Sequence, residues 1–309
     1  MIRRFLITLA ALSFTLLGGG CSSEQAVQTA IQFERKLSHL ERKQVTIDGH
    51  TVFYQEGGAG DTILMLHGFG ADADNWTRFA RPITGQYHVI APDLPGSGES
   101  SRLQQANYSI PSQAQRVLAL LDALKIDKAH LVGNSMGGYI AAWFAANHPE
   151  RVRSLALFDN AGVLGPHLSP FYQSLQNGRN RLVVAHPAQF DDLWQLVFAN
   201  PPYLPGFAKQ YLADKAYQHR DFNQKIFNEV REPYLPLEPL LPKIVAPTLI
   251  VWGEADQVLD ISSIAVMKTH LTHTQPEVVT LPGVGHLPMV EQPKQTARIY
   301  LDFIQRIRG

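Results

Sequence analysis

The feature that most constrains the fold of this chain is a repeated alternation of short apolar runs and helical segments. The apolar runs cover residues 62–66, 87–91, 129–132, 154–158, 248–252 and 277–281. Continuous runs of this kind are typical of strands buried on both faces of a parallel sheet. Helical spacing of apolar residues follows at 117–124, 141–145 and 299–304. Strands that alternate with helices predict an α/β fold on one mostly parallel sheet.

Two further patterns divide the chain. Apolar positions before and after Asp48 and Gly49, a turn pair, predict a hairpin near the start of the fold. The alternation stops at about residue 162 and resumes at about 244. The interruption contains no strand-like run, and it is rich in proline and aromatic residues. We therefore predict a core made of residues 44–161 and 244–309, with a helical cap inserted at 162–243.

The first 20 residues have the layout of an export signal. A basic start is followed by an apolar stretch, residues 5–17, that is too short to span a bilayer. Three glycines then precede Cys21, the only cysteine of the chain. An ordinary signal peptide cut near the glycines is one interpretation. A bacterial lipoprotein signal, with Cys21 as the lipidated residue, is the one we favour, although Gly18 stands where such signals usually carry leucine.

Either signal predicts an exported protein, and a single cysteine offers no disulfide to stabilise it. With Ser22 rather than aspartate after Cys21, a lipid anchor would place the protein at the outer membrane, whereas an ordinary signal would leave it periplasmic or secreted. The polar stretch 21–43 is predicted to be a tether or loose helix between the anchor and the core. The expected partners are thus the membrane surface and a small-molecule substrate.

Charge and motif content exclude several classes of function. Lysine and arginine together number 27, as do aspartate and glutamate, and no basic run indicates a nucleic-acid partner. No histidine, cysteine or carboxylate cluster has metal-ligand spacing, so neither a metal nor a cofactor is expected. Residues 93–100, Asp-Leu-Pro-Gly-Ser-Gly-Glu-Ser, lack the Gly-Lys-Ser/Thr ending of a nucleotide loop and are interpreted as a structural turn.

Residues 133–137, Gly-Asn-Ser-Met-Gly, fit the pattern Gly-x-Ser-x-Gly. The pattern is weak by itself, because a chain of this length meets it by chance roughly one time in ten. Its position between a buried strand and a helix makes it informative. A sharp turn there exposes the serine oxygen above the sheet, and the helix N-terminus faces the developing negative charge. Ser135 is therefore the candidate nucleophile.

A serine nucleophile needs a base, and His286 is the candidate among twelve histidines. It lies in a glycine-rich loop just after the last predicted strand, and loops at the carboxyl ends of strands form the site in such sheets. The acid that orients the base is predicted to be Asp256, which follows the penultimate strand. Asp159, at the end of the strand before the insertion, is the main rival. Glu254 and Asp260 are placed less well.

An oxyanion hole requires two backbone donors. One is expected from Met136, the residue after the nucleophile, and the other from Phe69, in the loop that follows the strand 62–66. The order along the chain is Ser135, Asp256, His286, which is an order known for a serine triad on a parallel α/β sheet. The serine motif, the loop histidine and the loop aspartate are each weak signals, but together they predict one catalytic site.

These motifs together resemble the α/β-hydrolase superfamily, and the resemblance covers nearly all of the chain after residue 44. The resemblance rests on the motifs at residues 67–70, 93–98, 133–138, 252–256 and 283–286. The cap segment 200–205 and residues 31–35 resemble bacterial family V lipases and the related monoacylglycerol lipases. This resemblance implies a carboxylic ester hydrolase acting on acylglycerols through a Ser-His-Asp triad and an acyl-enzyme.

Two alternatives remain open. Carbon–carbon bond hydrolases of ring-cleavage products carry the same Gly-Asn-Ser-Met-Gly-Gly string, but they act inside the cell, and the export signal argues against them. A non-catalytic binding module on the same fold is the other alternative, and the complete set of candidate triad residues argues against it.

Overall fold

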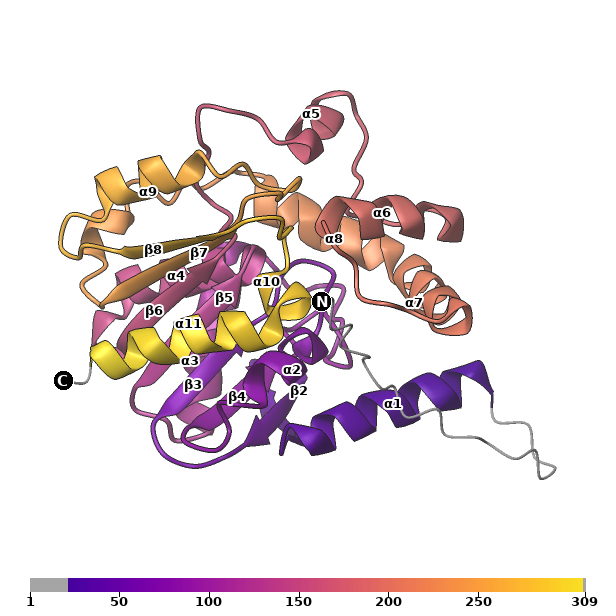
Figure 1. Cartoon of the computed structure of the whole chain (residues 1–309), viewed down its shortest axis with the longest axis horizontal. Helices are drawn as coiled ribbons and strands as arrows, with labels where there is room; N and C mark the ends of the chain where they lie inside the picture. The colour runs from indigo at the N-terminus through magenta and orange to yellow at the C-terminus, as the bar shows by residue number, and fades with distance from the viewer. Residues whose placement is uncertain (1–21, 308–309) are drawn as a thin grey trace, which may run out of the picture.

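An eight-stranded sheet in the order β1-β2-β4-β3-β5-β6-β7-β8 forms the centre of the molecule (Figure 1). The computed structural model describes residues 22–307. The strands are β1 (Glu41–Ile47), β2 (His50–Gly57), β3 (Thr62–Leu66), β4 (His88–Pro92), β5 (Ala129–Asn134), β6 (Val152–Phe158), β7 (Thr248–Gly253) and β8 (Glu277–Leu281). Only β1 with β2 and β2 with β4 pair antiparallel. The predicted α/β fold with a mostly parallel sheet is confirmed.

Helices cover both faces of this sheet (Figure 1). On one face lie α3 (Ile110–Ala123), α4 (Met136–Asn147) and α9 (Ser263–His270), and on the other α2 (Thr77–Ala80), α10 (Pro288–Glu291) and α11 (Pro293–Arg306). Every residue of β3, β5 and β7 is buried, which explains their uninterrupted apolar runs. The predicted hairpin joins β1 to β2 with Ile47 opposite His50. At its turn, Asp48 and Gly49 have φ of 47° and 74°.

Within the stretch predicted to be a tether or loose helix, 21–43, the described residues from 22 onward are mainly a helix packed on the core. Helix α1 (Ser23–Leu37) begins at a capping box, in which Ser22 and Gln25 each accept the other's backbone N–H. Arg35 donates to both carboxylate oxygens of Asp74 at 2.7 Å. Strand β1 also starts at residue 41, three residues before the predicted boundary of the core.

Helices α5 (Pro170–Gln176), α6 (Phe190–Val197), α7 (Gly206–Gln218) and α8 (Arg220–Arg231) occupy the segment predicted to be a cap, 162–243. They gather on one side of the sheet (Figure 1). Val184, Phe190 and Ala213 form a small buried cluster of their own within this segment. The ring of Phe227, on α8, lies 5.7 Å from that of Phe69 and joins the segment to the core.

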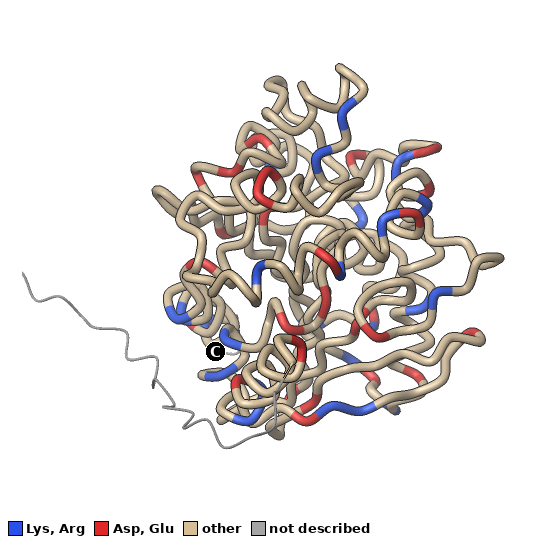
Figure 2. The backbone as a smooth tube through the Cα atoms, turned by 90° about the vertical axis from the view of Figure 1, so that its right-hand side faces the viewer, with Lys and Arg blue, Asp and Glu red and all other residues tan. Residues whose placement is uncertain are grey.

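The predicted signal peptide, 1–20, and Cys21 lie outside the described residues. Among residues 22–307, no helix is both long enough and apolar enough to cross a bilayer. Basic and acidic residues are interspersed on the side of the molecule that Figure 2 shows.

The ion pair between α1 and the core provides a test of this packing. Arg35→Ala leaves the carboxylate of Asp74 without two charge-assisted hydrogen bonds, so we expect the free energy of unfolding to fall by about 1–3 kcal/mol. Lys36→Ala, at an exposed position of the same helix, is the control and should change it by less than about 0.5 kcal/mol. Urea unfolding of both variants measures the difference. Equal small effects would mean that the pair of Arg35 and Asp74 contributes little to the stability of the fold.

Candidate active site

The turn at Ser135 between β5 and α4 has the geometry that the sequence motif predicts. Ser135 has a φ of 55°, in the left-handed region that non-glycine residues rarely adopt. Its backbone N–H donates to the carbonyl of Phe158 at 3.0 Å, and its carbonyl accepts from Ala161 at 3.2 Å. These bonds to the end of β6 hold the strained turn in place.

Two glycines allow the backbone to pack around this turn. A Cβ on Gly137 would lie 2.1 Å from the carbonyl oxygen of Leu66, so α4 could not approach the end of β3 with any other residue there. A Cβ on Gly68 would lie 3.3 Å from the Cβ of Ser135. The loop that carries Phe69 is therefore immediately beside Ser135, as an oxyanion hole requires.

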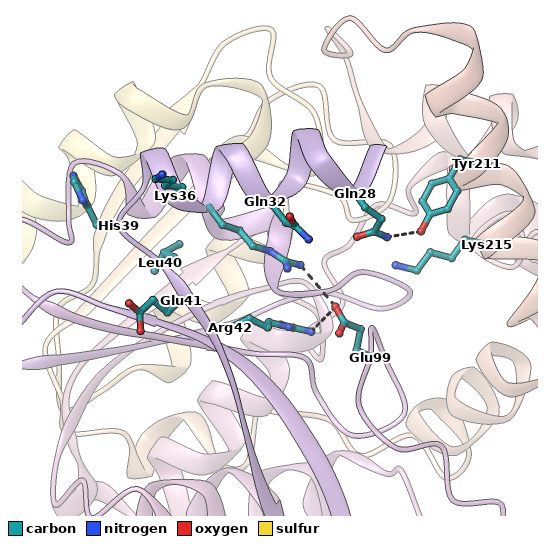
Figure 3. A pocket seen from close by; sticks show the side chains of 11 residues that line it. Gln28, Gln32, Lys36, His39, Leu40, Glu41, Arg42, Glu99, Tyr211 and Lys215 are labelled. Atoms are coloured by element: carbon teal, nitrogen blue, oxygen red, sulfur yellow. Dashed lines mark hydrogen bonds and ion pairs between the residues drawn. The ribbon is translucent and has the colours of Figure 1, made fainter. Parts of the chain in front are cut away.

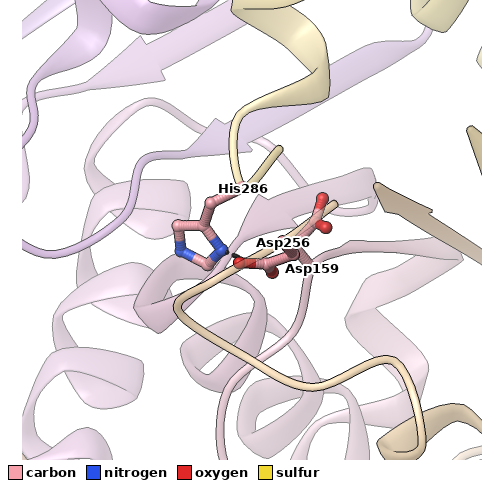
Figure 4. Close-up of side chains that lie close together, drawn as sticks. All are labelled: Asp159, Asp256 and His286. Carbon is pink, nitrogen blue, oxygen red and sulfur yellow. Dashed lines mark hydrogen bonds and ion pairs between the residues drawn. The ribbon is translucent and has the colours of Figure 1, made fainter. Parts of the chain in front are cut away.

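His286 and Asp256 are brought together from loops that follow β8 and β7. Nδ1 of His286 lies 2.8 Å from Oδ2 of Asp256 (Figure 4). The two side chains are 5% and 1% exposed. Since a carboxylate can only accept, the imidazole proton at this bond is on Nδ1, which leaves Nε2 as the basic nitrogen. The amide of Asn134 donates to the carbonyl of His286 at 3.0 Å and ties this loop to the residue before Ser135.

The three rival acids are placed differently. Glu254 accepts from the hydroxyl of Thr280 at 2.7 Å, and Asp260 accepts from the backbone of Ser262 at 2.9 Å. Asp159 is fully buried and lies close to Asp256 and His286 (Figure 4). The structure thus brings two carboxyl groups, not one, to the side of His286.

The loop that carries Phe69 is held by a neutral histidine. His67 is fully buried, its Nδ1 is 2.7 Å from the carbonyl of Gly68, and its Nε2 accepts from the N–H of Leu94 at 2.9 Å. One nitrogen must donate and the other accept, which only the neutral ring can do. Burial lowers the pKa of His67, which also favours the neutral ring. Asp93 accepts from the backbone of Ala73 at 2.9 Å, so the segment after β4 is a structural turn, as predicted.

Two residues that support the site were not recognised in the sequence. Glu291 accepts from the backbone of Gly285 at 2.7 Å and of Asn200 at 2.8 Å, so it joins the loop of His286 to the end of α6. Asn134, the variable position of the serine motif, donates to both Phe158 and His286. No local pattern marks either residue. Both partners of Asn134 are distant along the chain, as is Asn200, a partner of Glu291.

Among the described residues, one group of side chains could hold a metal ion. Single ligand atoms of Asp159, Asp256 and His286 all lie within 4.8 Å of one another. The group includes His286, the candidate base, so a cation bound there would compete with the protonation of His286. We therefore assign two of them, Asp256 and His286, to acid–base chemistry.

A polar groove of about 910 Å³ lies elsewhere, between α1, the start of β1 and α7 (Figure 3). Arg42 lies 3.2 Å and Arg35 3.9 Å from the carboxylate of Glu99, and Gln28 donates to the hydroxyl of Tyr211 at 2.7 Å. Of the predicted site residues that the structure describes, none lines this groove. Its arginines are already paired with carboxylates, and we assign it no substrate.

Comparison with known proteins agrees with this geometry. A sequence model of the alpha/beta hydrolase fold family matches residues 61–293. Lipase 1 of Psychrobacter immobilis is 35% identical over 301 residues, which cover 94% of each chain. A monoacylglycerol lipase of Xenopus laevis is 32% identical over 263 residues, which cover 82% of this chain and 77% of the relative.

A crystal structure described as a membrane phospholipase A, a novel bacterial virulence factor, has a TM-score of 0.91 at 47% identity and covers 93% of each chain. The chain belongs to the alpha/beta hydrolase fold family. The predicted class, an ester-hydrolysing enzyme of the lipase and esterase type, is confirmed.

Substitution of the three candidate residues tests their roles. We expect Ser135→Ala and His286→Ala each to lower kcat by about 10⁴-fold or more, because nucleophile and base act as a unit. Asp256→Asn should lose about 10³- to 10⁴-fold, because the amide can donate to Nδ1 and so favours the wrong tautomer. Hydrolysis of p-nitrophenyl esters measures all three.

Asp260→Asn is the matched control in the same loop and should keep its activity, since Asp260 contacts only the local backbone of Ser262. A fluorophosphonate probe should label the wild type and the control but not Ser135→Ala. Labelling of Ser135→Ala would identify a different nucleophile.

Proposed function

We propose that this enzyme hydrolyses acyl esters of glycerol, with Ser135, His286 and Asp256 as its catalytic triad. The 2.8 Å bond between Asp256 and His286, beside the left-handed turn at Ser135, carries the proposal. Ser135 Oγ attacks the ester carbonyl while Nε2 of His286 takes its proton. The backbone N–H groups of Met136 and Phe69 stabilise the oxyanion, and His286 then protonates the leaving alcohol.

The second half of the reaction releases the fatty acid. Water attacks the acyl-enzyme with His286 again as base, and Ser135 recovers its proton when the intermediate collapses. Asp256 holds the imidazole in one tautomer and stabilises its charged form through both steps. Each proton that His286 takes up is returned within one cycle.

Aromatic side chains between the core and the cap supply an apolar wall for the acyl chain. The ring of Phe227 lies 5.7 Å from that of Phe69 and 6.3 Å from that of Phe171, both edge-on. Phe69 is also the proposed oxyanion residue, so the wall begins at the reaction centre. An acyl chain laid against these rings buries its methylenes at about 0.8 kcal/mol each.

Hydrolysis of phospholipid acyl esters is the second candidate function. The 47% identity to the chain described as a membrane phospholipase A favours it. The bond broken is the same, and only the head group on the glycerol differs. A panel of monoacylglycerols, triacylglycerols and diacyl phospholipids with matched acyl chains separates the two candidates by kcat/KM. A vinylogous diketone in the same panel tests carbon–carbon cleavage.

Truncation of the apolar wall tests the position of the acyl chain. We expect Phe227→Ala to lower kcat/KM for a dodecanoate ester by roughly 10- to 100-fold, since the loss of apolar contact costs about 1–3 kcal/mol. Acetate esters, which do not reach the wall, should change by less than about threefold. Phe207→Ala, an exposed phenylalanine on α7, is the control. An equal loss on both esters would instead show that Phe227 supports the oxyanion loop.

We also propose that the protein is exported and lipid-anchored through Cys21. Helix α1 begins at Ser23, so an anchor at Cys21 would hold the core close to the bilayer, with no long flexible linker between them. Phe33 on α1 is 60% exposed, and Tyr203, just before α7, is 81% exposed. Exposed aromatic rings of this kind favour the membrane interface.

The intact mass of the mature protein tests the anchor. We expect the N-terminus to be a Cys21 that carries acyl chains, each of which contributes about 0.8 kcal/mol per buried methylene to membrane binding. Cys21→Ala should abolish this modification and leave soluble protein or uncleaved precursor, whereas the neighbouring Ser23→Ala should not. An unmodified Cys21, or cleavage at another bond, would identify an ordinary secreted enzyme.

A further inference from the structure

A buried carboxyl group that the mechanism does not use lies next to the acid–base pair. Asp159 follows β6, and its side chain is fully buried. Oδ1 accepts from the backbone N–H of Gly253 at 2.9 Å, whereas Oδ2 is buried with no hydrogen-bond partner among the described residues. One oxygen of Asp159 lies within 4.8 Å of an oxygen of Asp256 and of a ring nitrogen of His286 (Figure 4).

Two carboxyl groups this close in a buried site do not both ionise, and one keeps a proton. Their hydrogen bonds decide which one it is. Asp256 accepts from the backbone of Val258 at 2.7 Å and of Leu259 at 3.1 Å, and from Nδ1 of His286 at 2.8 Å. Each of these donors favours its charged form, whereas Asp159 accepts from one donor. The proton therefore belongs to Asp159.

We propose that Asp159 is a neutral carboxylic acid whose Oδ2–H donates a hydrogen bond to the carboxylate of Asp256 and thereby positions that carboxylate against His286. The inference rests on the proposed triad. Protonation of Asp159 gives its unpartnered Oδ2 a hydrogen-bond acceptor, because a protonated carboxyl oxygen can donate whereas a charged one cannot. Asp159 is a positioning residue and does not contact the substrate.

The surrounding charges agree with a neutral Asp159. Burial, followed by the neighbouring carboxylate of Asp256, raises the pKa of Asp159 well above its usual value, and Glu291 acts in the same direction. Nδ1 of His286 is bonded to Asp256 at 2.8 Å. A single negative charge beside the imidazole stabilises its charged form in the transition state.

Asparagine imitates the neutral acid at this position. Its oxygen can accept from Gly253, its amide can donate to Asp256, and it tolerates the φ of 44° that Asp159 adopts. Leucine has neither group. We expect Asp159→Asn to keep kcat/KM for a p-nitrophenyl ester within about threefold, and Asp159→Leu to lose about 100-fold in kcat with little change in KM, as expected when a catalytic group is misplaced.

The proton itself is measurable without activity. Aspartate in the unfolded chain loses its proton near pH 4, whereas folded Asp159 keeps it, so this residue makes the wild type less stable as the pH rises above about 4. Asparagine does not titrate. The melting temperature of Asp159→Asn relative to the wild type should therefore increase from pH 4 to pH 8. The infrared difference between the two proteins at neutral pH should contain the carbonyl band of a neutral carboxylic acid.

Several outcomes would overturn the proposal. They are an Asp159→Asn variant as inactive as Asp256→Asn, a pH-independent difference in melting temperature, and an infrared difference without the acid band. Activity lost with EDTA and restored by Zn²⁺ would mean that the carboxyl groups share a cation instead. If Ser135→Ala remained active, the proposed triad would fail, but the infrared and stability measurements would still report the proton on Asp159.

Discussion

The active site depends on a close approach of two backbone segments, the end of β3 and the first turn of α4. A Cβ on Gly137 would lie 2.1 Å from the carbonyl oxygen of Leu66, so this approach requires glycine. It places the loop of Phe69 beside Ser135 and fixes where an oxyanion can form. Ser135, in the turn that leads into α4, adopts the left-handed region at a cost of about 1–3 kcal/mol. Hydrogen bonds to the end of β6 offset that strain.

Much of the core could be predicted from the sequence because buried parallel strands carry a continuous apolar signal. The run predicted at 62–66 is β3 to the residue, and those predicted at 129–132 and 154–158 fall short of β5 and β6 by two residues each. Since the carboxyl ends of parallel strands meet at one edge, the order of strands also predicts that Asp256 and His286 meet. The structure places them 2.8 Å apart.

The features that could not be predicted depend on partners distant in sequence. Helix α1 has few apolar residues, and its polar side chains, which suggest a tether, include Arg35, which is paired with Asp74. A local signal did exist, because Ser22 and Gln25 have the spacing of a capping box. The choice between Asp159 and Asp256 was open in the sequence for a similar reason. The two carboxyl groups differ in the number of donors each receives, which only the fold determines.

The loop of His286 and the end of α6 share one support. Glu291 accepts from Gly285, next to the histidine, and from Asn200, just after α6. The backbone N–H of His286 also donates to the carbonyl of Val197, the last residue of α6, at 3.0 Å. Burial raises the pKa of Glu291, and its backbone donors oppose that effect. Because these bonds join α6 directly to the loop of His286, α6 cannot move far from the core without breaking a bond that holds this loop.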